Sequence, residues 1–147
     1  MLLSETLKRR KMDCQTIIAS FLFLGSSKAS KDFDGLKRIG ITHIVNLAGK
    51  QYFPGSFQYK RAFFEDSQEA TFVPLLQEIF DFIENAKTNG GRVLVHCQGG
   101  ISRSPSVVIA YLMKMHNETY QDALDLVKRQ RKCVRPNANF ISQLRNL

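Results

Sequence analysis

The sequence predicts an α/β protein in which a central, mostly parallel twisted sheet of about five strands is flanked by helices. Two observations favour this fold class. Short apolar, β-branched runs such as HIVNL and VLV alternate with longer segments whose apolar residues recur every three or four positions. Strands that alternate with helices build layered α/β proteins with a largely parallel sheet. The 147 residues, 44% of them hydrophobic, fit one domain with its own core.

The first half of the chain contains several strand signals and one short helix. Ile17–Gly25 is rich in apolar and aromatic residues and predicts one or two strands before a Gly-Ser-Ser turn. In Ser30–Gly40, apolar residues recur at three-residue steps, which predicts a short helix with Gly40 beyond its end. The run His43–Leu47 predicts a buried strand, and partial alternation predicts another at Phe57–Phe64.

The second half is dominated by helices. Phe72–Asn85 carries one continuous apolar stripe and predicts an amphipathic helix, with Pro74 tolerated in its first turn. Val93–Val95 predicts a buried strand, and the segment after Pro105 is apolar nearly all round, which predicts a central helix. The pattern Thr119-x-x-Asp resembles a capping box and opens the next helix.

The C-terminal region contains one more predicted helix. Arg135-Pro136-Asn137 interrupts the chain, and by spacing alone Asn137 is interpreted as the N-cap of that helix. Its inward face is expected to consist of Phe140, Ile141 and Leu144. Four basic residues lie near the end of the preceding helix, where the helix dipole favours cations: Lys128, Arg129, Arg131 and Lys132.

The segment Arg92–Ser106, RVLVHCQGGISRSPS, organises the rest of the chain. It places Cys97 at the end of a strand, on a glycine-containing loop that faces a helix N-terminus. Backbone N–H groups converge there and the helix dipole is positive, so the loop is a candidate anion site. Both features also favour the thiolate form of a cysteine over the thiol.

Arg103 stands six positions after Cys97, where a loop curled around an anion would place it opposite the sulfur. A guanidinium is always charged, and its planar fork of donors matches two phosphoryl oxygens. The chemistry implied is nucleophilic attack of sulfur on phosphorus. The candidate phosphate-binding residues are Gln98, Gly99, Gly100, Ile101, Ser102 and Arg103.

The pattern His-Cys-x-x-Gly-x-x-Arg-Ser resembles the signature of cysteine-dependent protein phosphatases, and its Ser-Arg-Ser-Pro ending resembles the dual-specificity branch. The resemblance covers roughly Ile17–Leu147. It implies a protein tyrosine phosphatase-like fold and a single catalytic domain over 1–147, with its core at about 17–147 and an N-terminal extension at 1–16. Other segments that carry the resemblance are Phe23–Ser26, Gly40–His43, Ala110–Met113 and Arg135–Asn137.

The resemblance also implies a general acid, since the leaving oxygen needs a proton that a thiolate cannot supply. In the family this acid is an aspartate on a loop some thirty residues before the cysteine. Asp66 precedes Cys97 by 31 positions (97 − 66) and is therefore the predicted acid. Glu65 and Glu69 are neighbouring alternatives, and a solvated or helix-capping role for Asp66 is the competing interpretation.

Three supporting residues are implied in the same way. Ser104 matches a serine that hydrogen-bonds the sulfur and helps it leave, although an N-cap is an alternative role. His96 resembles a residue that orders the loop without facing the substrate. Asn137 matches an asparagine that braces the active-site loop.

The predicted function is hydrolysis of phosphotyrosine and phosphoserine or phosphothreonine in proteins, including kinases, through a phosphocysteine intermediate. No metal or organic cofactor is expected. The chain has no spare length for a deep tyrosine-specific cleft, so a shallow pocket is expected. Alternatives are a phosphoinositide or RNA 5′-phosphate phosphatase, a non-catalytic module that binds phosphorylated ligands, and a sulfur-transfer or arsenate-type enzyme with a Cys-x5-Arg loop.

Net charge and cysteine content indicate which partners and which cellular compartment to expect. The net charge of +8 favours anionic partners, but no nucleic-acid motif is visible and no apolar run is long enough to span a membrane.

Cys14, Cys97 and Cys133 form no CxxC pair, which favours a reducing compartment. The cytoplasm is expected, with the nucleus as an alternative because of the basic run Lys8–Lys11. Cys133 is interpreted as a core cysteine, with a redox-resolving role as the alternative. The oligomeric state is left open.

Overall fold

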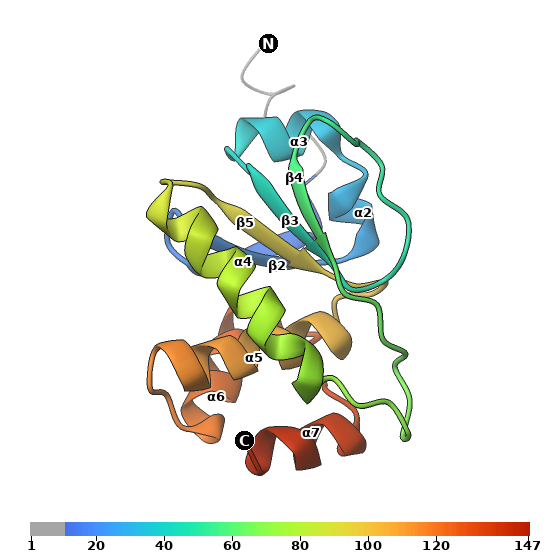
Figure 1. The fold of residues 1–147 in the computed structure, drawn as a ribbon, viewed down its shortest axis with the longest axis vertical. Coiled ribbons are helices and arrows are strands. Elements are labelled where there is room, and N and C mark those ends of the chain that lie inside the picture. The colour runs from blue at the N-terminus through green and yellow to red at the C-terminus, as the bar shows by residue number, and fades with distance from the viewer. Residues whose placement is uncertain (1–10) are drawn as a thin grey trace.

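A computed structural model describes residues 11–147 and confirms the predicted α/β fold (Figure 1). Five strands form one sheet in the order β1-β2-β5-β3-β4. Their bounds are Cys14–Ile18 for β1, Leu22–Gly25 for β2, His43–Asn46 for β3, Gln58–Arg61 for β4 and Val93–His96 for β5. Strand β1 runs antiparallel to β2, and all other neighbours are parallel. The sheet is thus mostly parallel, with β5 at its centre.

Helices cover both faces of this sheet. Their bounds are Ser27–Ser30 for α2, Phe33–Arg38 for α3, Leu76–Thr88 for α4 after a 3-10 turn at Val73–Leu75, Arg103–Met115 for α5, Tyr120–Gln130 for α6 and Ala138–Arg145 for α7. Figure 1 shows α2 and α3 on one side of the sheet and the longer helices on the other. Successive strand residues point to opposite faces of the sheet. Leu94 therefore packs in the cluster that contains Leu36 of α3, and Val95 packs in the cluster that contains Ile109 of α5.

The first strand begins earlier than the apolar pattern indicates. Strand β1 starts at Cys14, three residues before the expected start of the domain core at residue 17, and Cys14 pairs with Gly25. Gln15 pairs with Leu24. This strand lies at the edge of the sheet and pairs on one side only, so its first residues can be polar. A search for apolar runs therefore does not detect them. Residues 1–10, which include most of the predicted N-terminal extension and of the basic run, lie outside the described residues.

The helix predicted at 30–40 corresponds to α3, which begins at Phe33, and an additional helical turn, α2, precedes it. Asp32, which the sequence offered as a cap beside Ser30, caps α3, because its Oδ1 accepts a hydrogen bond of 2.9 Å from the Gly35 amide. Ser26 caps α2 in the same manner through the Lys28 amide. The capping residues therefore decide where these helices begin, and the three-residue apolar steps do not reveal α2.

Strand β5 positions the site, since it is paired on both sides. Its residue His96 lies level with Gly25 of β2 and Asn46 of β3. The carboxyl ends of these three parallel strands meet at one edge of the sheet, which is where open α/β sheets bind ligands. Within residues 11–147, no helix is both long and apolar enough to cross a membrane.

Candidate active site

The loop after β5 surrounds the sulfur of Cys97. Cys97 is 2% exposed and follows His96, the last residue of β5. The Gly100 amide donates a hydrogen bond of 3.3 Å to Cys97 Sγ, and Ser104 Oγ lies 3.1 Å from the same sulfur. Helix α5 begins at Arg103, so its N-terminal end is directed at the loop. Donors and a positive helix end converge on the predicted nucleophile, an arrangement that stabilises an anion.

Ser104 lies inside the first turn of α5, so the interpretation of Ser104 as an N-cap is wrong. Ser102 occupies the capping position, and its side chain makes no capping hydrogen bond. The fully buried Ser104 hydroxyl has the Cys97 sulfur at 3.1 Å and the Gly25 carbonyl oxygen at 3.4 Å. The carbonyl can only accept, so the single hydroxyl proton has two acceptors whenever the sulfur is a thiolate.

Arg103 connects this loop to the segment after β4. Its Nη1 donates a hydrogen bond of 3.1 Å to the carbonyl oxygen of Phe64, and the side chain is half-buried. Asp66 follows two residues later and is exposed. The contact therefore holds the segment that carries the predicted acid next to the phosphate-binding loop.

Asn137 joins the segment of Asp66 to the same loop. Its Nδ2 donates to Asp66 Oδ1 over 2.7 Å and to the Ser67 carbonyl oxygen over 3.3 Å, and its backbone N–H donates to Ser102 Oγ over 2.9 Å. Its Oδ1 also accepts from the Phe140 amide and caps α7. The structure thus places Asn137 in both of the positions that the sequence suggested. Glu65 and Glu69 are exposed, and the Asn137 amide contacts neither.

His96 lies behind the loop. It is 2% exposed, and burial lowers its pKa to about 4. Its Nδ1 lies 3.2 Å from the Cys97 carbonyl oxygen. A carbonyl only accepts hydrogen bonds, so the neutral ring carries its proton on Nδ1 in this contact. His96 can fix the orientation of the peptide that follows Cys97.

Arg131 is a neighbour of the loop that the sequence did not reveal. Its pattern in the sequence is that of a solvated cation at a helix end, yet the residue is 4% exposed. Its guanidinium donates to the carbonyl oxygens of Gly99 and Gly100, both over 2.9 Å. No pattern along the sequence indicates this contact. It depends on the proximity of Arg131 to the loop in space, which only the folded structure shows.

Cys133 is exposed, so its interpretation as a core cysteine is wrong. It follows the end of α6 in a turn, and its Sγ lies 4.0 Å from the Gly100 carbonyl oxygen. The apolar residue buried in this turn is Val134, at 3% exposure. All three cysteines are free thiols. Among residues 11–147, no group of three or more His, Cys, Asp or Glu side chains could hold a metal ion.

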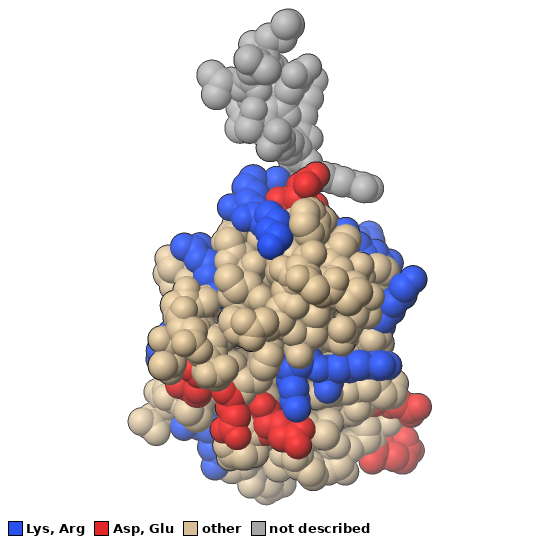
Figure 2. Space-filling model, turned by 45° about the horizontal axis from the view of Figure 1, so that its top comes forward, with Lys and Arg blue, Asp and Glu red and all other residues tan. Residues whose placement is uncertain are grey.

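Figure 2 shows how charge is distributed over one face of the molecule. Basic side chains lie there in several separate groups, and most acidic side chains lie toward the lower end. No single basic patch dominates this face.

Comparison with known proteins places the chain in a family. Residues 22–147 match the model of the family described as "Dual specificity phosphatase, catalytic domain". Human "Dual specificity protein phosphatase 2" is 43% identical over 86% of this chain and 41% of its own length. "Protein phosphatase Slingshot" of Drosophila melanogaster is 39% identical over 91% of this chain and 13% of its own length. The chain thus spans less than half the length of these curated relatives.

Solved structures agree with the sequence comparison. The human "tyrosine phosphatase-like serine/threonine/tyrosine-interacting protein" superposes with a TM-score of 0.87 at 32% identity, covering 92% of this chain and 95% of that one. A mouse putative dual specificity phosphatase complexed with zinc tungstate gives 0.87 at 29% identity, covering 95% and 88%. The predicted resemblance is confirmed, and the chain belongs to the family of dual specificity phosphatase catalytic domains.

Proposed function

We propose that this chain hydrolyses phosphotyrosine and phosphoserine or phosphothreonine in protein substrates through a phosphocysteine intermediate. The observation that carries the proposal is the environment of the Cys97 sulfur. A backbone amide reaches it from the loop, and a hydroxyl reaches it from the first turn of the helix that follows. Family membership supports the same chemistry, as does the similarity to relatives named as protein phosphatases.

In the first step, the Cys97 thiolate attacks the phosphorus and forms the S–P bond while the P–O bond to the leaving group breaks. Arg103 and the loop amides stabilise the charge on the three non-bridging oxygens. Asp66, entering as the carboxylic acid, gives its proton to the departing oxygen. A positioned general acid typically contributes a factor of about 10²–10⁴ to the rate.

In the second step, water attacks the phosphocysteine. Asp66, now a carboxylate, takes a proton from that water, the S–P bond breaks, and inorganic phosphate leaves. The departing thiolate regains its two donors, the Gly100 amide at 3.3 Å and the Ser104 hydroxyl at 3.1 Å. The cycle returns every group to its starting protonation state.

A tetrahedral oxyanion fits this loop on chemical grounds. A mouse relative of similar structure is described as complexed with zinc tungstate, and tungstate is a tetrahedral dianion like phosphate. This likeness supports the proposed substrate class.

A second candidate is a module that binds phosphorylated proteins without turnover. It is favoured by the structural neighbour named as a tyrosine phosphatase-like serine/threonine/tyrosine-interacting protein.

The experiment that tests the proposal measures phosphate release from paired phosphotyrosine and phosphothreonine peptides in reducing buffer. Wild type, Cys97→Ser and Cys133→Ser are compared, the last because Cys133 is an exposed thiol beside the same loop. Release from both peptides by wild type and Cys133→Ser, abolished in Cys97→Ser, is the expected result. Peptide binding without release by the wild type would favour the binding module. Release confined to phosphoinositide or RNA 5′-phosphate substrates would replace the substrate class.

A further inference from the structure

Arg131 is a buried charge held entirely by groups of the protein. It follows the last residue of α6 and is 4% exposed. An arginine cannot become neutral inside a protein, so burial is tolerated only where its donors are satisfied. Here Nε donates to Gly100 O and Nη2 to Gly99 O, both over 2.9 Å, while Nη1 donates to Asp13 Oδ1 over 2.9 Å and to Gln15 Oε1 over 2.7 Å.

We propose that Arg131 is a positioning residue that turns the amides of the phosphate-binding loop toward the anion, and that Asp13 holds Arg131 in place for this task. The inference deepens the proposed phosphatase function and rests on it for the identity of the anion.

The geometry of the peptide bond carries the argument. A trans peptide is planar, so its C=O and the N–H of the next residue point in opposite directions. The peptide between Gly99 and Gly100 directs its oxygen at Arg131 and its N–H at Cys97 Sγ, at 2.9 Å and 3.3 Å. One guanidinium hydrogen bond therefore sets the direction of the amide that reaches the sulfur.

The next peptide is held in the same way. Arg131 Nε binds Gly100 O, so the N–H of Ile101 must point away from the guanidinium. Two successive amides are thus turned to one side of the loop and two successive carbonyls to the other. If either peptide flipped, a carbonyl oxygen would face the phosphoryl group and repel it.

Gly100 shows that loop and guanidinium are fitted to each other. Its φ is +67°, a backbone conformation that favours glycine. A Cβ at this position would lie 2.7 Å from Arg131 Nη2 and 2.7 Å from the Gly25 carbonyl oxygen. The guanidinium and the Gly25 carbonyl therefore occupy the space that a larger residue at position 100 would need.

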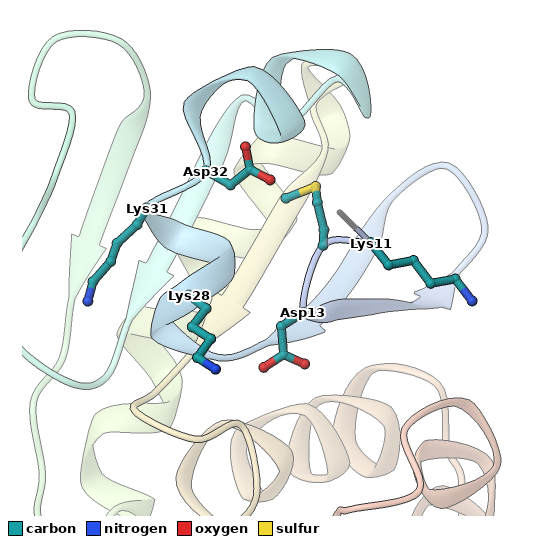
Figure 3. Close-up of a pocket in the computed structure, with 6 residues that line it drawn as sticks. Lys11, Asp13, Lys28, Lys31 and Asp32 are labelled. Atoms are coloured by element: carbon teal, nitrogen blue, oxygen red, sulfur yellow. The ribbon is translucent and has the colours of Figure 1, made fainter. Parts of the chain in front are cut away.

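Asp13 completes the arrangement from the N-terminal side. It accepts from Arg131 and from Ser26 Oγ, and its backbone oxygen accepts from the Ser26 amide. The hydrogen bond from Arg131 is the largest of the effects that lower the pKa of Asp13. Figure 3 shows Asp13 and Lys28 pointing in the same direction along one side of a cavity of about 780 Å³, while Lys11 and Lys31 extend away from each other.

Oxyanion binding tests this proposal without requiring turnover. The Cys97→Ser chain, which has no nucleophilic thiol, is titrated with tungstate by calorimetry, alone and combined with Arg131→Lys, Arg131→Met or Asp13→Asn. Lys132→Met is the matched control, since Lys132 is the next residue and is exposed. Melting temperatures are measured for every variant.

Arg131→Lys keeps the charge but cannot bind two carbonyls and a carboxylate through a planar fork. We expect it to weaken tungstate binding at least tenfold in a chain that still folds. Arg131→Met should weaken binding further, Asp13→Asn severalfold, and Lys132→Met less than twofold. In the active chain, the same order should appear in kcat/KM for an activated aryl phosphate.

Tungstate affinity in folded Arg131→Lys and Asp13→Asn equal to that of Lys132→Met would overturn the proposal and leave Arg131 a stability residue only. If Arg131→Met does not fold, these two conservative variants carry the test. Tungstate binding that follows the expected order while the wild type releases no phosphate would contradict the phosphatase function and support the positioning role.

Discussion

The side-chain amide of Asn137 donates a 2.7 Å hydrogen bond to the carboxylate of Asp66, although the two residues are 71 positions apart. Asn137 also binds Ser102 of the phosphate-binding loop through its backbone and caps α7 through its Oδ1. The residue that caps the last helix therefore ties the predicted acid to the predicted phosphate-binding loop.

Replacement of Asn137 by serine separates its two roles. Serine is a good N-cap, but its side chain is too short to hold Asp66, so we expect the melting temperature to stay nearly unchanged while kcat falls. Asn137→Ala should lose both roles, with a stability loss of about 1 kcal/mol for the cap. Thermal unfolding and steady-state kinetics measure the two effects. Equal kcat in Asn137→Ser and wild type would show that the contact with Asp66 has no catalytic importance.

Asp66→Asn should slow substrates with poor leaving groups far more than activated ones. A poor leaving group, such as the serine alkoxide, needs the proton, whereas a nitrophenolate departs without it. For poor leaving groups we expect a loss of about 10²–10⁴-fold, the usual contribution of a general acid. The measurement is kcat/KM, which reports the step in which the leaving group departs, across a series of aryl and alkyl phosphates, with Glu65→Gln and Glu69→Gln as controls. Equal losses across the series would contradict the assignment of Asp66.

Ser104→Ala should slow the second step selectively. Without the hydroxyl at 3.1 Å, the departing sulfur has one donor fewer, so phosphocysteine should accumulate. Rapid-mixing kinetics with an aryl phosphate should show a burst of phenol followed by a slower steady state. The buried hydroxyl of Ser106, which donates to the Ser102 carbonyl oxygen over 2.7 Å, gives a matched control in Ser106→Ala. A burst of the same size in both variants would show that the Ser104 hydroxyl has no special role.

His96 should make folding sensitive to mild acid. Its folded-state pKa of about 4 lies below the ordinary 6.5, so the unfolded chain takes up this proton more readily. The stability from the neutral ring is therefore complete above pH 6.5 and is lost as the pH falls from 6.5 toward 4. At 1.36 kcal/mol per pKa unit, the free energy of unfolding falls by about 3 kcal/mol in total.

Denaturant unfolding between pH 7.5 and pH 5 measures this dependence. His96→Asn should be less stable at pH 7.5 but should show a flatter pH profile than the wild type. His116→Gln is the control, because His116 is an exposed histidine of the same chain. A wild-type slope in His96→Asn would mean that other groups cause the acid sensitivity.

The parts of this molecule that sequence could predict are those specified by neighbours along the chain. The alternation of apolar runs gave the order of strands and helices, and the spacing within HCQGGISR placed Cys97 and Arg103 on one loop. The short helix α2 at Ser27–Ser30 was not predicted, because its Gly-Ser-Ser start has the pattern of a turn.

What sequence could not predict depends on contacts between distant segments. Arg131 is 31 residues from Gly100 and 118 from Asp13, and its pattern at a helix end is identical to that of a solvated cation. The exposure of Cys133 has the same origin, because burial in a turn is decided by which neighbouring residue meets the core. Long-range partners follow only from the completed fold.

The central position of β5 has a consequence for how the chain is assembled. Strands β2 and β3 are not paired with each other, and the pair β1–β2 joins the pair β3–β4 only through β5. Until residue 96 has left the ribosome, both present unpaired hydrogen-bonding edges, which are templates for aggregation. Closing these non-local pairs is entropically costly and slow. The strand that precedes Cys97 is thus also the one whose insertion completes the sheet, so nascent chains that end before it should depend on chaperones.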